Sequence, residues 1–170
     1  MGTIDCLVNC ASIFENDDIL NFNNQRWQSH FDVNLKAPAI LSGEFAKQKK
    51  NIQGNIINII DQRIFKLTPY FLSYTLSKAG LETLTKTLAM KFAPKIRVNC
   101  IAPSITQSKM AKPILDNARI AEQIPLKHAM KRVGSPEDLA ETAKFLLLPN
   151  SSWITGQVIH VDGGKINIET

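Results

Sequence analysis

A tyrosine and a lysine spaced one helical turn apart form the most reactive pair in the sequence. Tyr74 and Lys78 make a Tyr-x-x-x-Lys spacing, which places both side chains on one face of a helix. An ammonium group near a phenol favours the phenolate, so the spacing predicts a tyrosine whose pKa falls from about 10 toward neutrality and that exchanges protons with a substrate. The alternative is a surface tyrosine beside a solvated lysine, because so short a motif also occurs by chance.

An asparagine on an apolar helical face is the second candidate. Asn34 lies among aromatic residues in the helix predicted over residues 25–47, so a buried amide there would need hydrogen-bond partners. Pro38, four residues later, has no N–H for the Asn34 carbonyl, which is then free to hold a water molecule or a ligand. The alternative is a proline kink beside a core asparagine whose hydrogen bonds are satisfied.

Two further candidates come after predicted strands. Asp61 is the residue directly after the strand predicted over residues 55–60, at the carboxyl edge where open α/β sheets bind ligands, and its carboxyl group is suited to proton exchange there. Taken alone, Asp61 is explained more simply as the first residue of a turn, paired with Arg63. Phe14 lies beyond the first strand and is either a platform for a flat ring or a core aromatic residue.

The elements that would position these residues alternate between strands and helices. Strands are predicted over residues 4–9, 55–60, 96–101 and 157–161, each nearly continuous in hydrophobicity, as burial on both faces of a parallel sheet requires. This alternation predicts an α/β fold. The length of 170 residues indicates one domain.

Three helices are predicted between the strands. The first covers residues 25–47, is capped by Asn23 or Asn24, and has an apolar stripe of Trp27, Phe31, Leu41 and Phe45. The second covers residues 75–92, with an apolar face of Leu81, Leu84, Leu88 and Phe92. The third has Ser135 as its cap and Pro136 as its first residue, and extends to residue 148. Residues 102–134 are predicted to be a loop with one short helix, of the kind that covers or binds a ligand.

Composition excludes several classes of protein. The net charge of +5 comes without a basic arm or an aromatic-basic platform, so we expect no nucleic-acid partner. No apolar run approaches the roughly 20 residues needed to cross a membrane, and we expect a cytoplasmic chain. The three cysteines (Cys6, Cys10 and Cys100) and three histidines (His30, His128 and His160) show no metal-binding spacing. We therefore expect no disulfide and no metal, and we interpret the histidines as structural.

Five segments, in order, resemble the short-chain dehydrogenase/reductase family. They are Leu7-Val8-Asn9-Cys10-Ala11-Ser12, Asn34 in Asp-Val-Asn-Leu, the Tyr74 to Lys78 region, Ile96 to Pro103, and Thr155-Gly156 with Val161-Asp162-Gly163-Gly164. The resemblance implies the C-terminal part of a doubly wound, three-layer Rossmann fold and a nicotinamide-dependent reductase acting on a carbonyl or pterin. It also implies NADPH or NADH as cofactor, and a homodimer or homotetramer formed through the two long helices.

The resemblance assigns roles to single residues. Tyr74 would relay a proton, Lys78 would bind the nicotinamide ribose, and Asn34 would hold a relay water. The cofactor would also contact Asn9, Ala11, Pro103, Ser104 and Ser108. Asp61 stands where the family usually has serine. Pteridine reductases and the similar dihydromonapterin reductases have an aspartate at that position. That likeness implies a pterin site in which Asp61 assists protonation and Ser12 and Phe14 line the pocket. Cys10 for asparagine and Ser104 for glycine depart from the family pattern.

The glycine-rich turn of the family is not in the sequence. The eight glycines form no Gly-x-Gly-x-x-Gly motif, and we expect the N-terminal strands that cradle the cofactor phosphates to be missing. The explanations are a truncated or split gene product that is inactive alone, a misplaced start codon, or a second polypeptide that completes the fold. We favour the first, because hydride transfer requires the cofactor to be held at contact distance. The alternative function is a non-catalytic remnant or an interaction subunit, whose open sheet edge would pair with another chain.

Overall fold

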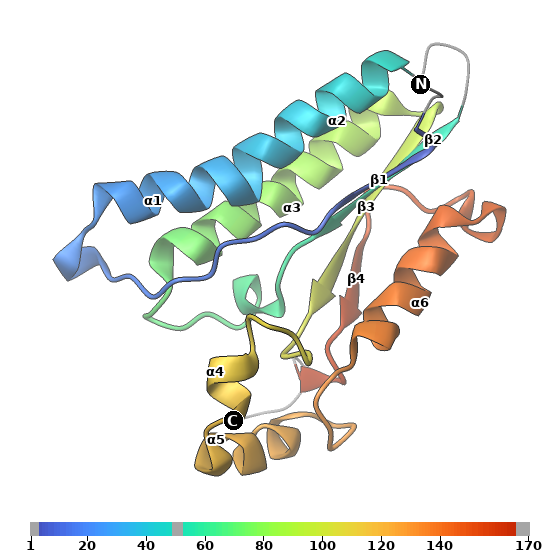
Figure 1. The fold of residues 1–170 in the computed structure, drawn as a ribbon. Coiled ribbons are helices and arrows are strands. Elements are labelled where there is room, and N and C mark those ends of the chain that lie inside the picture. The colour runs from blue at the N-terminus through green and yellow to red at the C-terminus, as the bar shows by residue number, and fades with distance from the viewer. Residues whose placement is uncertain (1–3, 49–52, 166–170) are drawn as a thin grey trace.

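The computed structural model describes residues 4–48 and 53–165, which form a parallel sheet between two helical layers. The strands are β1 (Cys6–Asn9), β2 (Gly54–Ile59), β3 (Ile96–Pro103) and β4 (Val158–Val161), in the order β1-β2-β3-β4. Figure 1 shows α1, α2 and α3 on one face of the sheet and α6 on the other. The predicted three-layer α/β fold is therefore confirmed, with strand boundaries within two residues of those expected.

The first predicted helix is interrupted by a wider turn. It consists of α1 (Asn24–Phe31), a π-helical turn (Asp32–Lys36) and α2 (Ala37–Gln48), and the Asn23 side chain caps it by accepting from the Arg26 N–H. Within the turn the Ala37 N–H donates to the Asp32 carbonyl, five residues back. Pro38 explains the position of the turn, because it has no N–H to donate to the Asn34 carbonyl.

The wider turn corrects the predicted apolar stripe. One additional residue in the turn rotates α2 by about 100° relative to its place in a regular helix. Ser42 and Phe45 therefore face the core, whereas Leu41 is 50% exposed, and its prediction as a buried residue was wrong. Close packing of this turn against the next helix depends on Gly80, since a Cβ there would lie 2.8 Å from Leu35 Cδ2.

The remaining helices match the predicted order but not every boundary. α3 covers Leu72–Phe92, three residues longer at its start than expected, and α6 covers Pro136–Leu147. The predicted cap of α6 is confirmed: Ser135 Oγ accepts from the Asp138 N–H and Asp138 accepts from the Ser135 N–H. The loop after β3 contains more helix than expected, namely α4 (Lys112–Leu115), α5 (Ala118–Gln123) and a 3₁₀ turn at Pro125–Lys127.

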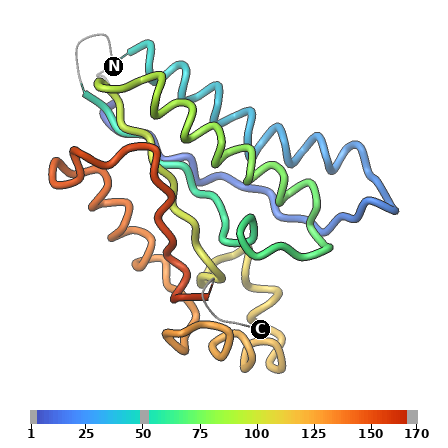
Figure 2. The backbone as a smooth tube through the Cα atoms, turned by 180° about the vertical axis from the view of Figure 1, so that it is seen from behind, coloured from blue at the N-terminus to red at the C-terminus, as the bar shows by residue number. Residues whose placement is uncertain are grey.

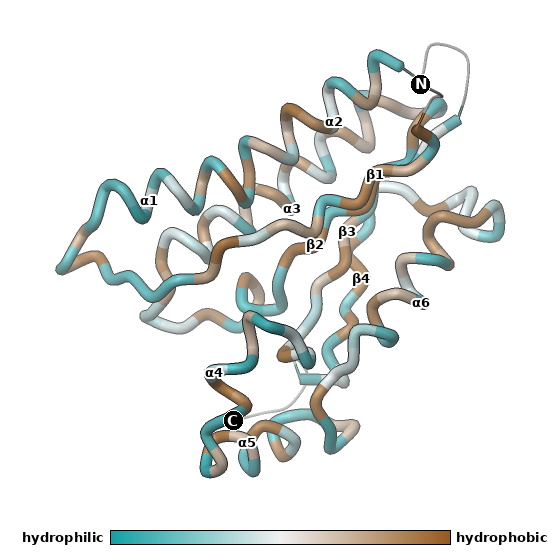
Figure 3. Tube along the Cα trace, viewed as in Figure 1, coloured by the Kyte–Doolittle hydropathy of each residue, from teal (hydrophilic) through white to brown (hydrophobic). Residues whose placement is uncertain are grey.

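Alternating side chains of β2 and β3 build a core on each face of the sheet. Ile56 and Val98 pack with Phe45 under α2 and α3, whereas Ile57 and Ile101 pack with Leu146 of α6. Figure 3 shows brown, apolar positions along these central strands, interrupted by hydrophilic ones. Because both faces are covered, the carboxyl ends of the strands are the part of the sheet left to form a site. Figure 2 shows the segment after β3 gathered at that end.

Candidate active site

The Tyr74 hydroxyl meets the Asp61 carboxylate at the carboxyl end of β2. Tyr74 lies in the first turn of α3, is 3% exposed, and donates to Asp61 Oδ2 at 2.7 Å. The other carboxylate oxygen of Asp61 accepts from the Arg63 N–H at 2.8 Å and caps the 3₁₀ turn Gln62–Ile64. Asp61 is therefore a turn residue, as the simpler interpretation supposed, and its carboxylate also contacts the Tyr74 hydroxyl.

These surroundings reverse the expected shift of the tyrosine. Burial, followed by the charge of Asp61 and its hydrogen bond, raises the pKa of Tyr74 well above its usual value, while Arg63 and a hydrogen bond with Ser12 oppose the rise. The expectation that Lys78 brings the phenol pKa toward neutrality was wrong. The carboxylate contacts the hydroxyl directly, whereas the Lys78 Nζ lies 5.9 Å from the centre of the tyrosine ring. At neutral pH Tyr74 therefore keeps its proton, which lies in the hydrogen bond to Asp61.

Lys78 is buried beneath the tyrosine. Its side chain is 2% exposed and Nζ donates to the Ile59 carbonyl at 2.8 Å. Burial lowers the pKa of Lys78 to about 8, opposed by the charges of Asp61 and Cys10. An ammonium group has three N–H donors, and within the described residues the hydrogen bond of Nζ is the one to Ile59. The remaining donors could hold the hydroxyl groups of a ribose, so the Lys78 ammonium fits the nicotinamide cofactor that the fold implies.

Asn34 fixes the segment after β1 against α3. The side chain is fully buried; Oδ1 accepts from the Ile13 N–H at 2.9 Å and from Ser12 Oγ at 3.2 Å. Nδ2 donates to the Ile13 carbonyl at 3.0 Å and to Ser77 Oγ at 3.1 Å. The amide is thus satisfied by the protein, as the structural alternative supposed. The Asn34 backbone carbonyl lies in the π-helical turn.

Phe14 is part of an aromatic group beside the tyrosine. Its ring stacks on Phe71 at 4.3 Å between centroids and meets Tyr74 edge-on at 4.7 Å. The Arg63 guanidinium lies 4.6 Å from the Phe71 centroid and 5.5 Å from that of Phe14. One face of Phe14 is therefore covered by Phe71, so a flat ligand cannot stack on that face.

The residues expected to hold the cofactor are distributed over the ends of two strands and the loop after β3. Asn9 is turned toward the core, where Nδ2 donates to Asn58 Oδ1 at 2.7 Å, while Ala11 is exposed just beyond β1. Pro103 ends β3, and Ser104 is the next residue. Ser108 lies on the surface and its Oγ accepts from the Ala111 N–H at 3.2 Å.

Two buried histidines link the site to the surrounding loops. His30 Nδ1 lies 2.6 Å from Ser73 Oγ, and its Nε2 accepts from the Glu15 N–H at 3.2 Å. His128 Nε2 lies 2.8 Å from Ser104 Oγ. Neither histidine was expected to contact the site, although His30 lies one helical turn before Asn34, and that spacing could have indicated a shared face.

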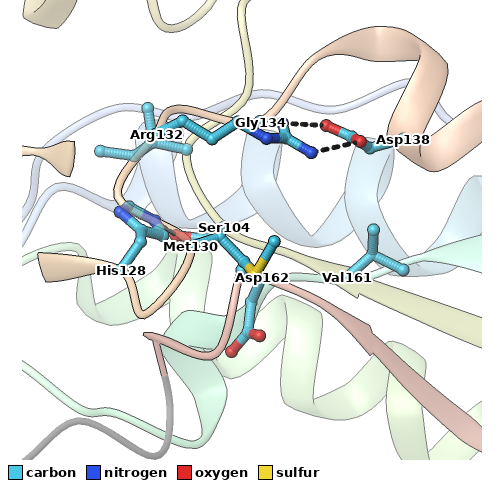
Figure 4. A pocket seen from close by; sticks show the side chains of 10 residues that line it. Ser104, His128, Met130, Arg132, Gly134, Asp138, Val161 and Asp162 are labelled. Carbon is cyan, nitrogen blue, oxygen red and sulfur yellow. Dashed lines mark hydrogen bonds and ion pairs between the residues drawn. The ribbon is translucent and has the colours of Figure 1, made fainter.

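A cavity of about 150 Å³ lies on the β3–β4 side of the site. Figure 4 shows Ser104 and His128 on one side of it and the Arg132–Asp138 ion pair on another. That ion pair holds the pKa of Asp138 well below its usual value. Neither Tyr74 nor Asp61 lines this cavity.

The described residues contain no group of three or more side chains suited to hold a metal ion. Within the same residues, no helix has the length and apolar character needed to cross a membrane.

Comparison with known proteins identifies the family. Residues 1–165 match the family model described as enoyl-(acyl carrier protein) reductase. The human dehydrogenase/reductase SDR family member 4 is 32% identical over 166 residues, which are 96% of this chain and 60% of that protein. The 3-oxoacyl-[acyl-carrier-protein] reductase FabG of Chlamydia muridarum is 36% identical over 96% of this chain and 66% of its own length.

Among solved structures, the FolM alternative dihydrofolate reductase 1 of Brucella suis, in complex with NADP, is 37% identical with a TM-score of 0.89. The match covers 99% of this chain and 66% of that one. The chain therefore spans about 60 to 66% of the length of these relatives. On the family match and the shared fold, this chain belongs to the short-chain dehydrogenase/reductase family of oxidoreductases.

Proposed function

We propose that this chain carries the proton-transfer part of a nicotinamide-dependent reductase site that acts on a carbonyl or a pterin C=N bond. The observation that carries the proposal is the 2.7 Å hydrogen bond from the buried Tyr74 hydroxyl to Asp61, with Lys78 buried beside it. Asn34 and Ser12 hold the segment after β1 against the same part of α3.

The protonation state of Tyr74 favours reduction over oxidation. A phenol whose pKa is raised keeps its proton at neutral pH and can give it to the atom that gains electrons. Asp61 accepts the hydrogen bond in the resting site and assists the transfer. The Asn34 carbonyl would hold a water molecule that returns a proton to the site, and Ser12 and Phe14 would line the substrate pocket.

NADPH is the proposed cofactor, with NADH as the alternative, and it supplies a hydride when bound. The Lys78 ammonium would hold the ribose hydroxyls, while Asn9, Ala11, Pro103, Ser104 and Ser108 would surround the nicotinamide half. The complex of the Brucella suis relative with NADP supports NADPH. Asp61 and the similarity to that relative support a pterin substrate in particular.

Assembly through the two long helices is also a proposal. α2 and α3 expose several large apolar side chains, of which Met90 is 76%, Ile40 55% and Leu41 50% exposed. A homodimer or homotetramer would cover them. A cytoplasmic location remains a prediction from the sequence.

The test measures cofactor binding and turnover separately. Binding of NADPH and NADH to the purified chain is measured by fluorescence, and NADPH consumption is measured with dihydrofolate and with a 3-oxoacyl thioester. We expect the purified chain alone to bind NADPH weakly, and a version completed with the N-terminal strands of a full-length relative to bind it and to lose about 10²- to 10⁴-fold in turnover on Tyr74→Phe. Tyr70→Phe removes the hydroxyl of the chain's other tyrosine, which is exposed, so it is the matched control and should leave turnover unchanged. Equal turnover by Tyr74→Phe and the unmodified chain would remove Tyr74 from the mechanism.

A further inference from the structure

Positive charge exceeds negative charge around the Asp61 carboxylate. Asp61 attracts both Lys78 and Lys165, and Arg63 lies close enough to oppose the rise in the Tyr74 pKa. Even if Lys78 is reserved for the cofactor, the two cations Arg63 and Lys165 face one carboxylate. Within this group the cations therefore outnumber the one carboxylate.

Arg63 is positioned by its contacts but is not neutralised by them. Its guanidinium packs on the Phe71 ring at 4.6 Å, and Nη1 donates to Thr68 Oγ1 at 2.9 Å. The Asp61 carboxylate bonds to the backbone N–H of Arg63 and to the Tyr74 hydroxyl. None of the ion pairs found within residues 4–48 and 53–165 includes Arg63. A guanidinium has five N–H donors in a planar fork, so donors remain for a ligand.

Lys165 adds a second cation to the same place. Lys165 is half-buried and follows β4. Burial lowers its pKa, and the charge of Asp61 opposes this lowering. Repulsion from Arg63, Lys127 and Lys66 lowers the pKa further. Repulsion among cations that are partly removed from water costs free energy, and an anion bound between them would offset that cost.

We propose that the substrate carries a carboxylate, which Arg63 binds with Lys165 beside it. Arg63 lies two residues after Asp61 in the sequence and packs on the aromatic residues that flank Tyr74. A carboxylate held by its planar guanidinium would place the reducible bond of the same molecule near the Tyr74 hydroxyl. The placement of the reducible bond rests on the proposed reductase function, whereas the binding of the carboxylate does not.

The experiment compares a dicarboxylate with its neutral counterpart. Succinate and succinamide are titrated separately into the chain at fixed ionic strength, and binding is detected through backbone amide signals in NMR spectra. We expect succinate to shift the signals of residues 61–68 and 165 and to bind at least about ten-fold more tightly than succinamide. Arg63→Gln should lose about that factor for succinate only, and Arg63→Lys should retain part of it. Arg119→Gln, which removes one charge from an exposed side chain of α5, is the matched control and should bind as the unmodified chain does.

The possible outcomes distinguish the carboxylate site from the reductase proposal. Equal binding of succinate and succinamide, or unchanged succinate binding by Arg63→Gln, would overturn the carboxylate site whatever the turnover. If Arg63→Gln does not fold, Arg63→Lys and Lys165→Gln decide: a several-fold loss of succinate binding in each supports the site, and no loss in both overturns it. A version completed with the N-terminal strands that binds succinate through Arg63 but consumes no NADPH would contradict the reductase proposal alone.

Discussion

The Tyr74 cluster and the loop over residues 104–134 lie at the same end of the sheet but are held in different ways. In the cluster, buried side chains bond to one another across the sequence, as Asn34 does with Ile13 and Ser77. The loop consists of short helices and exposed turns, and its buried His128 contacts Ser104 Oγ and the Ile124 carbonyl within the loop. This difference indicates that the proton-transfer groups are positioned by the core, whereas the groups expected beside the nicotinamide depend on local turns.

Replacing one hydrogen-bonded side chain in each region is the strongest test of this difference. Asn34→Ala would leave the Ile13 N–H and carbonyl and the Ser77 hydroxyl without their partner, and we expect a loss of about 3 kcal/mol in the free energy of unfolding. Ser104→Ala removes one hydrogen bond with His128 and should cost about 1 kcal/mol. Urea unfolding measures both values. Equal losses would show that the two regions are held alike.

The burial of Lys78 in the Tyr74 cluster predicts that the free energy of unfolding depends on pH. The pKa of Lys78 is about 8 in the folded chain and about 10.4 when unfolded, so the unfolded state binds this proton more tightly. Below pH 8 both states are protonated and burial of the charge destabilises the fold. As the pH rises from about 8 to about 10, stability returns, by up to about 3 kcal/mol.

Lys78→Met provides the reference for this measurement. The difference in the free energy of unfolding between the unmodified chain and Lys78→Met should shift in favour of the unmodified chain across that range. The Cys100 thiol acts in the opposite direction, because burial raises its pKa to about 12 and the unfolded state loses the proton first as the pH rises. Its contribution is common to both chains and cancels in the difference. A constant difference would mean that Lys78 titrates in the folded chain as it does in water.

Removing the charge of Asp61 tests why the tyrosine keeps its proton. In Asp61→Asn the negative charge that helps burial to keep the proton on Tyr74 is lost, and we expect the pKa of Tyr74 to fall from its raised value. Near-ultraviolet absorbance of the phenolate reports this in a Tyr70→Phe background, where Tyr74 is the only tyrosine left. An unchanged titration would attribute the raised pKa to burial alone.

The smallest effect is expected in the loop. Ser108→Ala removes the hydrogen bond that its hydroxyl accepts from the Ala111 N–H, and should cost about 0.5 kcal/mol at this exposed position. Dissociation constants for NADPH measured before and after the change test its proposed contact with the nicotinamide. A loss of binding larger than the loss of stability supports that contact, and parallel small losses contradict it.

Local patterns in the sequence predicted the layers of the fold and the cap of α6. Continuous apolar strands and the Ser135-Pro136 start are features of neighbouring residues, so they can be recognised without knowledge of packing. The exposed Leu41 could not be predicted from a regular periodicity, because Pro38 shifts the helix by one residue. The three short helical turns in the loop have too few residues to produce a clear apolar period.

The candidate site was predicted in its members but not in its electrostatics. Spacing placed Tyr74 over Lys78, yet the group that contacts the hydroxyl is Asp61, thirteen residues away and on another element. The direction of the Tyr74 pKa is set by that long-range contact and by burial, and neither is a property of the Tyr-x-x-x-Lys motif. Arg63 was considered only as a turn partner of Asp61, although its position over two aromatic rings gives it access to the site.

The π-helical turn at Asp32–Lys36 has a consequence for how this helix can change length. Removing one residue here would restore ordinary α-helical winding and leave both flanking helices facing as they do now, because the wider turn accommodates one extra residue without rotating its flanks. His30 would then keep its contact with Ser73, and Phe45 would stay in the packing under β2. A single deletion should therefore preserve this packing when it falls between Asp32 and Lys36, whereas a deletion within α1 or α2 would turn one part of the helix by about 100° relative to the other.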